Sequence, residues 1–308
     1  MAVVTTRLGR SRPPLNRTLR RLLLGLFFVS PWLVGLIIFA AGPILASAAF
    51  SFTSYDVLTP PQWIGLGNYG TLIHDSLFWV SLSNTLYYTL LAVPLSIVVS
   101  LMLALLLNQK IWGLPLFRTF FYIPSIVPII TSSILWLAIL NPQSGMINNV
   151  LSAVGLPQPG WLASEYWSKP ALIMMSVWAS GGSMIILLAA LQGIPEHLYE
   201  AAEVDGATGA RKFWRITLPL LTPTMLFLMI IGVIGAFQYY TEAYVMTGGG
   251  PVNSTLFYAL YLFQNAFAYF KMGYASAMAW ILFFIVLAAS LAIMASSRRW
   301  VYYEGEVR

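Results

Sequence analysis

The sequence of 308 residues contains no cysteine and very few charged residues. Without cysteine it can form no disulfide framework, zinc–thiolate cluster or thiol nucleophile. Charged residues make up 8% of the chain, whereas soluble proteins carry about 25%. Because so few charges cannot cover the surface of a water-soluble protein of this size, the composition excludes a cytosolic enzyme and a secreted domain. Hydrophobic residues make up 59% and the mean hydropathy is +0.78, so most of the chain is expected to lie in lipid.

Long charge-free runs separate the few charged residues. A helix that crosses a bilayer needs roughly 20 apolar residues, and six runs are long enough to hold one. The longest run, 119–164, is interrupted by polar and proline-rich stretches and is expected to hold one helix only. The stretch 243–270 is expected to form a shorter interfacial or partly re-entrant helix. We therefore predict an all-α membrane protein, a bundle of six transmembrane helices near residues 22–50, 84–107, 118–140, 171–192, 223–246 and 273–296.

Basic residues lie almost entirely on one side of this predicted bundle. With six spans both termini share a side, which holds fourteen lysines and arginines, whereas the other side holds only Lys169 and Lys271. Because positive residues accumulate in cytoplasmic loops, both termini are predicted to be cytoplasmic. The net charge of +6 then reflects topology and contact with membrane lipid, and no nucleic-acid binding is expected. The chain divides into a basic tail, a membrane domain with a retained first helix, and a C-terminal tail, at residues 1–21, 22–297 and 298–308.

One segment between the fourth and fifth predicted helices breaks the apolar pattern. Residues 193–219 hold seven charged residues, with the acidic residues first and the basic residues last. Pro195 can open a short amphipathic helix, and Gly206 can adopt the left-handed conformation that ends it. A second short helix would then carry the basic residues. Two short helices joined by a bend are predicted, and a solvated loop lying on the lipid headgroups is the alternative.

The spacing within this segment resembles a known motif. Glu200-Ala201-Ala202, Gly206 and Ile216-Thr217-Leu218-Pro219 form the pattern E-A-A-x3-G-x9-I-x-L-P. This pattern resembles the cytoplasmic coupling loop of the membrane subunits of bacterial binding-protein-dependent ABC importers. Two further stretches, Gly248-Gly249-Gly250-Pro251 and 273–277, are similar to the sugar-importer branch, in particular to the maltose-F or glycerol-phosphate-A type of permease.

The resemblance implies a type I importer permease in the bacterial cell (inner) membrane. It also implies four kinds of partner, namely a second homologous permease, two ABC ATPase subunits that bind ATP and Mg, an extracytoplasmic sugar-binding protein, and membrane lipid. The coupling loop 193–222 would dock on an ATPase subunit. Its ATPase-coupling residues would be Glu200, Ala201, Ala202, Asp205, Gly206, Ile216, Leu218 and Pro219. The segment 141–169 and Gly249, Gly250 and Pro251 would face the binding protein.

A substrate pathway is expected on the helices that flank the coupling loop. In the fourth helix Met175, Trp178 and Gly182 recur at helical spacing and share a face. By the resemblance, this face would lie opposite Gly232, Ala236 and Tyr239 and line the pathway, although the glycines would equally suit close helix packing. Gln238 and Glu242 are expected to share a helix face near the outer end of the fifth helix. Glu242 either serves the pathway or sits among the headgroups.

No catalytic machinery is evident in the sequence. It has no G-x-x-x-x-G-K-[ST] nucleotide loop and no metal-ligand spacing, and its two histidines, His74 and His197, are far apart. We therefore expect a transporter subunit, with no catalytic residue, metal or cofactor of its own, that imports a carbohydrate. An importer of another solute such as glycerol phosphate is the alternative, although no lysine or arginine lies within a predicted helix. A secondary transporter is more remote, because it would bury carboxylates at mid-membrane.

Overall fold

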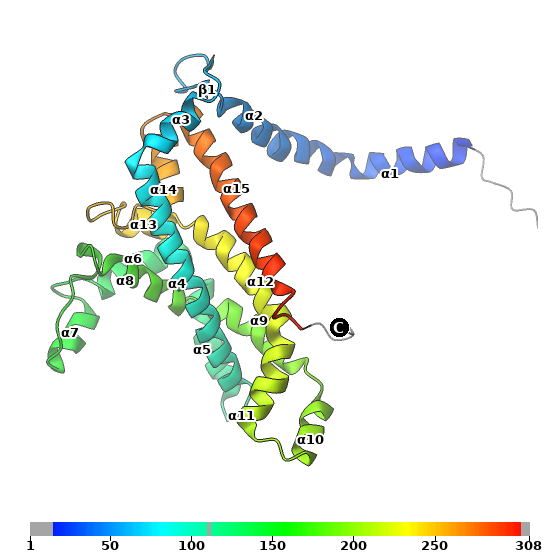
Figure 1. Cartoon of the computed structure of the whole chain (residues 1–308), viewed down its shortest axis with the longest axis vertical. Coiled ribbons are helices and arrows are strands. Elements are labelled where there is room, and N and C mark those ends of the chain that lie inside the picture. The colour runs from blue at the N-terminus through cyan, green and yellow to red at the C-terminus, as the bar shows by residue number, and fades with distance from the viewer. Residues whose placement is uncertain (1–14, 110–111, 303–308) are drawn as a thin grey trace, which may run out of the picture.

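The computed structural model describes residues 15–109 and 112–302 (Figure 1). Parts of the predicted tails, 1–14 and 303–308, lie outside these residues, as does Lys110. The described chain is mostly helical, which confirms the predicted fold class. Within it, four helical segments are long and apolar enough to cross a membrane. Two bent helix pairs raise this number to the predicted six when each pair counts as one crossing.

The first predicted span is an interrupted helix that begins earlier than expected. Helix α1, Leu15–Leu36, continues through a π-helical turn, Ile37–Ala41, into helix α2, Gly42–Phe50. Helix α2 packs against the last helix of the chain, α15, Met272–Ser297, whereas α1 projects away from the bundle (Figure 1). Large apolar side chains are therefore exposed along the whole span, among them Phe27, Phe28 and Phe39.

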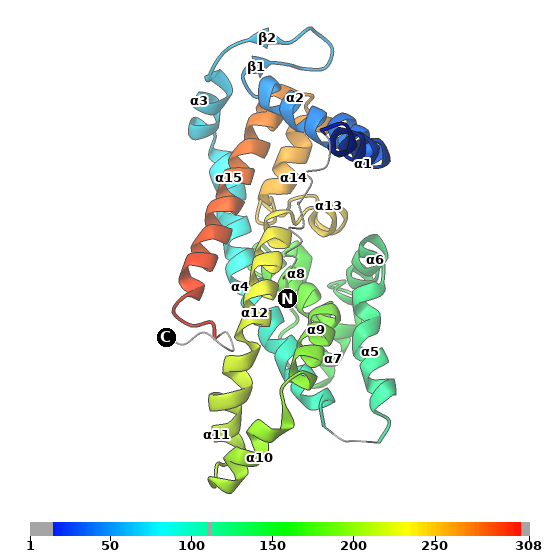
Figure 2. The same cartoon turned by 90° about the vertical axis from the view of Figure 1, so that its right-hand side faces the viewer.

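A small hairpin and a short helix form one end of the molecule (Figure 2). Strands β1, Thr53–Ser54, and β2, Gln62–Trp63, pair in antiparallel fashion with Thr53 opposite Trp63, and helix α3, Gly67–His74, follows. The backbone of β1 lies directly on α15. A Cβ atom at Gly273 would lie 2.1 Å from the carbonyl oxygen of Thr53, so only glycine allows this approach.

Helix α4, Ser76–Leu107, is the central element of the bundle and packs against α8, α9 and α12. It begins eight residues before the predicted start at residue 84. Asp75 explains the difference, because its carboxylate accepts a hydrogen bond of 2.9 Å from the backbone N–H of Leu77 and caps the helix. Pro94 lies inside α4 and is tolerated there.

The third predicted span, 118–140, is not one straight helix. It consists of α5, Leu114–Ile126, and α6, Ile129–Ile139, which are bent by 100°. Pro128 causes the break, because a proline lacks the amide N–H and forces the preceding residue out of the helical region. Val127 accordingly has an extended backbone. Two short helical elements complete the following segment, α7, Met146–Ala153, and a 3-10 turn, Trp161–Ala163.

The fourth predicted span, 171–192, is also bent. Helix α8, Ser168–Trp178, and helix α9, Gly181–Gln192, meet at 44°. Gly181 lies against the backbone of α5, where a Cβ atom would come within 2.2 Å of the carbonyl oxygen of Phe121. The bend therefore accompanies a close approach of two helix backbones that only glycine permits.

The fifth predicted span, 223–246, is divided in two. Helix α12, Leu218–Phe237, ends before Gln238, and a separate helix, α13, Thr241–Met246, follows. The break turns Tyr239 inward, where its ring lies 4.3 Å from the ring of Tyr88 and 5.2 Å from that of Phe257. Tertiary packing of these rings overrides the apolar pattern that predicted a continuous helix.

The stretch predicted as one interfacial or re-entrant helix forms several short elements. After α13 the chain makes a glycine-rich loop, then helix α14, Tyr258–Phe263, and a π-helical turn, Gln264–Ala268. Helix α15 follows close to its predicted bounds of 273–296. Past α15 the chain returns to the bundle, because the amide N–H of Tyr302 donates a hydrogen bond of 2.9 Å to the hydroxyl of Thr222.

Candidate functional sites: the segment between α9 and α12 and a cavity in the bundle

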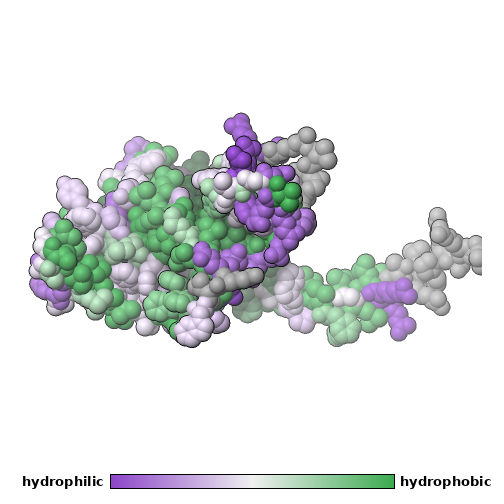
Figure 3. Space-filling view, turned by 90° about the horizontal axis from the view of Figure 1, so that it is seen from below, coloured by the Kyte–Doolittle hydropathy of each residue, from purple (hydrophilic) through white to green (hydrophobic). Residues whose placement is uncertain are grey.

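The charged segment projects beyond the bundle at the end opposite the hairpin (Figure 2). It forms helix α10, Glu196–Val204, helix α11, Gly209–Lys212, and a π-helical turn, Phe213–Thr217, that runs directly into α12. The structure therefore contains the two short helices and the bend that the sequence predicts. Seen from this end, strongly hydrophilic side chains gather in a patch beside a surface of mixed and hydrophobic character (Figure 3).

The bend depends on Gly206. Its φ angle is +73°, a left-handed conformation that residues with a Cβ atom adopt at a cost. The amide of Gly206 donates to the carbonyl of Glu203 at 2.9 Å, and the amide of Ala207 donates to that of Ala202 at 2.8 Å. These bonds close the last turn of α10. No other described part of the chain lies within 4 Å of a Cβ atom built at Gly206, so the surrounding space is open.

Two side-chain contacts fix α10 against the start of α12. The ammonium of Lys212 and the carboxylate of Glu203 form an ion pair, with the nitrogen and oxygen 2.7 Å apart. No second ion pair is found in the described part of the chain. Hydrogen bonding to Lys212, and then its positive charge, hold the pKa of Glu203 below its ordinary value. Tyr199 and Thr217 share a hydroxyl–hydroxyl hydrogen bond of 2.9 Å. These two contacts hold residues 196–217 together as one unit, called the clasped segment below. The spacing of charges in the sequence did not predict the Glu203–Lys212 pair.

The predicted coupling residues fall into two groups. Glu200, Ala201, Asp205 and Gly206 are exposed and Ala202 is half-buried, all on α10 or directly after it. Ile216, Leu218 and Pro219 are half-buried at the junction with α12. Val204, which the sequence reading did not single out as a contact, exposes 90% of its surface at the tip of α10. The first group can reach a partner, and the second anchors the segment to the bundle.

A cavity of about 270 Å³ lies within the bundle between α4, α8, α9, α12 and α13. A neighbouring cavity of about 230 Å³ lies toward α5 and α6 and shares Ser176, Tyr239 and Glu242 with the first. Four predicted pathway residues line the first cavity, namely Gly232, Ala236, Tyr239 and Glu242. The second is lined by Met175, Trp178, Tyr239 and Glu242. The structure thus brings six of the predicted residues together.

Two predicted pathway residues line neither cavity. Gln238 is exposed at the end of α12 and, because the helix ends at Phe237, it does not share a helix face with Glu242 as predicted. Gly182 lies beside Ser125 of α5, which agrees with the helix-packing alternative. Gly232 both lines the first cavity and allows close helix packing, since a Cβ atom there would come within 2.9 Å of the side chain of Val93.

Residues of α4 that the sequence reading missed form one wall of the first cavity. Tyr88, Ala92 and Ser96 recur at intervals of four and therefore share a helix face. A polar and small-residue stripe within an otherwise apolar span was the signal available in the sequence. Ser176 and Ser183 add hydroxyl groups from the opposite wall.

The cavity wall presents polar atoms with unused hydrogen-bonding capacity. The hydroxyl of Tyr239 is buried and has no hydrogen-bond partner among residues 15–109 and 112–302. Glu242 forms no ion pair with a described residue. The rings of Tyr88, Tyr239 and Phe257 pack on one another, with centroids 4.3 to 5.4 Å apart. Buried polar groups that lack partners are costly, so the arrangement suits a ligand that supplies hydrogen bonds.

The glycine-rich loop, which joins α13 to α14, packs at its end against two residues of the cavity wall. Phe257 at its end contacts the rings of Tyr88 and Tyr239. Asn84 of α4 binds the loop by donating hydrogen bonds of 2.8 and 3.1 Å to the carbonyl oxygens of Asn253 and Leu256.

A second set of contacts ties the same loop to α8. The ammonium of Lys169 donates a hydrogen bond of 3.0 Å to the side-chain oxygen of Asn84, and the hydroxyls of Ser168 and Ser254 are 2.9 Å apart. The predicted binding-protein contacts Gly249, Gly250 and Pro251 are in this loop, beside Val252, which exposes 79% of its surface.

Comparison with known proteins agrees with this architecture. The family model described as "Binding-protein-dependent transport system inner membrane component" matches residues 81–301. The probable ABC transporter permease protein YesP of Bacillus subtilis is 43% identical, over 92% of this chain and 93% of its own length. The lactose transport system permease protein LacF of Rhizobium radiobacter is 35% identical, over 86% and 91%.

A solved structure supports the same assignment. A chain of a bacterial alginate ABC transporter, in complex with an alginate pentasaccharide-bound periplasmic protein, superposes with a TM-score of 0.82. It is 25% identical and covers 93% of this chain and 98% of its own. These relatives are permease subunits and not enzymes, which confirms the prediction of a multi-pass transporter subunit. The chain belongs to the family of inner membrane components of binding-protein-dependent transport systems.

Proposed function

We propose that this permease carries a carbohydrate across the membrane and is driven by ATP hydrolysis in partner subunits. The segment between α9 and α12 is the observation that carries this proposal. A clasped helix pair that projects from the bundle and exposes Val204 at its tip has no role within the chain itself. Exposed apolar side chains on such a protrusion suit insertion into a partner.

Coupling would proceed through contact of α10 with an ABC ATPase. Glu200, Ala201, Ala202, Asp205 and Gly206 would meet the ATPase, and the two such subunits would bind the ATP and Mg²⁺. Because the Glu203–Lys212 pair fixes α10 to α11, a displacement of α10 would move the start of α12 as one unit. Ile216, Leu218 and Pro219 at that junction would transmit the movement to the cavity wall.

The cavity would form part of the pathway for the sugar. At about 270 Å³ it is smaller than the roughly 300–1,000 Å³ of complete small-molecule sites. A second, homologous permease would supply the remaining wall. The aromatic rings and the unpaired hydroxyl of Tyr239 suit the apolar face and the hydroxyl groups of a saccharide.

Helix α1 supports the second permease as a partner. It projects from its own bundle with its apolar side chains exposed, Phe27 to 71% and Phe28 to 80%. In water such a surface would be strongly unfavourable, so lipid and the second permease would cover it. The ends of the chain and the segment 193–222 would lie on the cytoplasmic side, and the hairpin and the glycine-rich loop would face the extracytoplasmic binding protein.

The chemistry of the cavity favours a sugar over a phosphorylated solute. No lysine or arginine lines either cavity, and Glu242 is the ionisable acid in both. An importer of glycerol phosphate would therefore depend on cations from the second permease. The relatives named for lactose, arabinooligosaccharides and trehalose/maltose support the same choice. A secondary transporter is a more remote candidate, because it would act without an ATPase.

Reconstitution tests the proposal. The chain would be purified with its co-isolated partners and placed in liposomes, and uptake of labelled saccharides would be measured with and without ATP. The binding protein in the preparation would be screened against a saccharide panel, with glycerol phosphate included. We expect uptake of a saccharide that requires ATP and the binding protein. Isolation without an ATPase, or uptake driven by an ion gradient alone, would contradict the proposal.

A further inference from the structure

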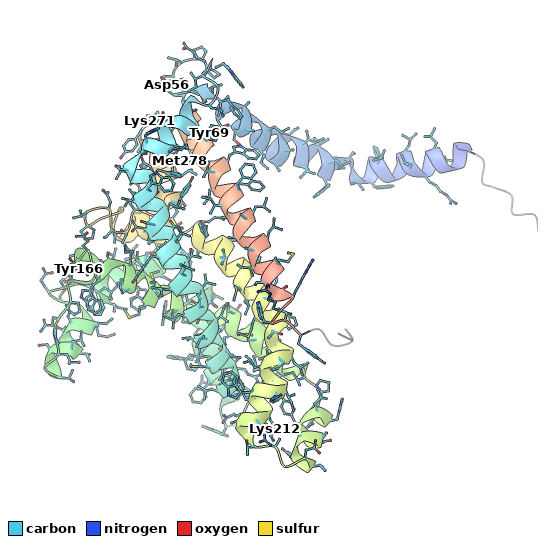
Figure 4. The ribbon with its side chains drawn as sticks, in the orientation of Figure 1. Asp56, Tyr69, Tyr166, Lys212, Lys271 and Met278 are labelled. Carbon is cyan, nitrogen blue, oxygen red and sulfur yellow. The ribbon has the colours of Figure 1, made fainter. Side chains whose placement is uncertain are left out.

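A further cavity, lined by polar residues and tyrosines, lies at the hairpin end of the described chain, away from the bundle cavity. It has a volume of about 490 Å³ and is bounded by the loop after β1, α3, the segment around α14 and the start of α15. Figure 4 shows Asp56 and Lys271 at this end, opposite Lys212 on the clasped segment. No aliphatic side chain lines this cavity, which is walled by carboxylate, amide, hydroxyl, phenol and ammonium groups. Such a composition is unusual for space left over between packed helices.

Two asparagines in the wall of this cavity are buried. Asn68 donates both of its amide hydrogens, to the carbonyl oxygens of Ser51 and Thr53 at 2.9 Å each. Asn265 donates to the carbonyl of Tyr261 at 2.9 Å. Neither side-chain oxygen accepts a hydrogen bond from another described residue, so both amides leave acceptor capacity in the wall.

Two carboxylates add negative charge. One oxygen of Asp56 accepts two hydrogen bonds from Thr59, at 2.7 and 2.8 Å, and the Asp56 side chain is exposed at the rim of the cavity. The hydrogen bond from the Thr59 hydroxyl, and then that from its backbone amide, lower the pKa of Asp56. Burial alone would raise the pKa of Asp75, but hydrogen bonds from Tyr261 and Tyr274 more than offset it. Both carboxylates are therefore ionised at neutral pH.

The donors of the cavity wall do not balance these acceptors. The phenol groups of Tyr261 and Tyr274 already donate to the carboxylate of Asp75, at 2.6 and 2.5 Å. Lys271 supplies the positive charge of the cavity wall, and it forms no ion pair with a carboxylate of the described chain. The cavity thus has one positive group against two negative ones, and the side-chain oxygens of its two asparagines are unused acceptors. A guest that is rich in donors and positively charged would complement it.

We propose that this cavity receives an arginine or lysine side chain of the extracytoplasmic binding protein when that protein docks on the permease. A guanidinium carries five N–H donors and no acceptor, and an ammonium carries three donors and none. Bonds from such groups to a carboxylate are about twice as strong as neutral ones. A saccharide, in contrast, brings an acceptor with every hydroxyl donor. The inference rests on the proposed function, which places this end of the molecule outside the cytoplasm.

The cavity wall is formed before any partner arrives. The amide of Gly273 donates a hydrogen bond of 3.0 Å to the carbonyl of Tyr55, directly before Asp56. The ring of Tyr55 stacks on that of Phe50 with centroids 4.7 Å apart. Because α15 holds the rim in place, little ordering remains to oppose docking.

Opposite charge changes at the rim test the proposal. The complete transporter would be placed in nanodiscs and its binding protein titrated at low and high salt, with the dissociation constant read directly. We expect Asp56→Asn to weaken docking by about three- to tenfold, because it removes the free carboxylate. Lys271→Gln should strengthen docking, because it removes the opposing ammonium. Both effects should shrink as salt shortens the screening length from about 10 Å at 0.1 M to about 3 Å at 1 M.

The direction of these changes separates the outcomes. A purely structural role for the cavity would make both variants equal to or weaker than the wild type, and would overturn the proposal. If the guest were acidic, Asp56→Asn would strengthen docking and Lys271→Gln would weaken it. If the guest were a saccharide, free saccharide would compete with the binding protein and salt would have no effect. Either result would overturn the proposal. Failure of the wild-type complex to bind any binding protein would instead contradict the proposed function.

Discussion

At the scale of single residues, glycines are needed for two different reasons, close approach of backbones and a positive φ angle. Gly181 and Gly273 are small so that backbones can approach, whereas Gly206 lies in open space and is needed for its positive φ angle. The motif spacing identified Gly206 from sequence because a bend after a helix leaves a local signature. The close approaches at Gly181 and Gly273 could not be predicted, because each depends on a backbone segment that is distant in sequence and packs there only in the folded protein.

Gly206 and Gly209 provide a matched pair for this distinction. A Cβ atom at either position meets nothing within 4 Å, but only Gly206 has a positive φ. Gly206→Ala should strain the bend by about 1–2 kcal/mol and reduce ATP-dependent uptake severalfold. Gly209→Ala should leave uptake near the wild-type level. Equal uptake by the two variants in proteoliposomes would show that the left-handed bend is unimportant for coupling.

Tyrosine hydroxyls allow a second residue-scale comparison. The hydroxyl of Tyr239 is buried without a described partner, whereas that of Tyr258 donates a hydrogen bond of 2.8 Å to the carbonyl of Met278. Tyr239→Phe should leave stability unchanged and weaken apparent sugar affinity by about three- to tenfold, the value of one hydrogen bond. Tyr258→Phe should lower stability by about 1 kcal/mol without changing affinity. Thermal unfolding in detergent and the KM for uptake report the two effects, and the opposite pattern would remove Tyr239 from the pathway.

At the scale of elements, the sequence located every long apolar helix but not its bends. Apolar length is a local property, and α15 lies close to its predicted bounds. The 100° bend between α5 and α6 had a local signal in Pro128 that was not used. The break between α12 and α13 had none, because it follows from the packing of Tyr239 on Tyr88 and Phe257, which are distant in sequence.

The anchoring of the glycine-rich loop is a prediction at this scale. Asn84→Ala removes the donors to the carbonyls of Asn253 and Leu256 and leaves Lys169 without its acceptor. Leaving such groups unpaired costs about 1–3 kcal/mol, so amide exchange in residues 254–258 should accelerate by about tenfold or more. Hydrogen exchange read by mass spectrometry checks this. Ser83→Ala is the control, because the hydroxyl of Ser83 bonds only to the exposed turn of its own helix. Unchanged exchange in the Asn84 variant would show that other contacts hold the loop.

At the scale of the whole molecule, the proposed functional sites lie at two opposite ends and in the cavity between them. The clasped segment extends from one end, and the hairpin, the polar cavity and the glycine-rich loop lie toward the other (Figure 1). Charge distribution predicted this polarity, since one loop and the tails hold most charges. The two cavities could not be fully predicted, because Tyr88 and Ser96 of α4 meet α12 only in the folded bundle.

Site-specific crosslinking tests the central claim most directly. The chain has no cysteine, so Val204→Cys and Pro251→Cys each introduce a single thiol without any background substitution. In the assembled transporter, a short reagent that couples to the thiol at one end and photocrosslinks at the other should join position 204 to an ATPase subunit and position 251 to the binding protein. Crosslinking of position 251 to the ATPase, or of position 204 to the binding protein, would contradict both the assigned sidedness and the coupling role of α10.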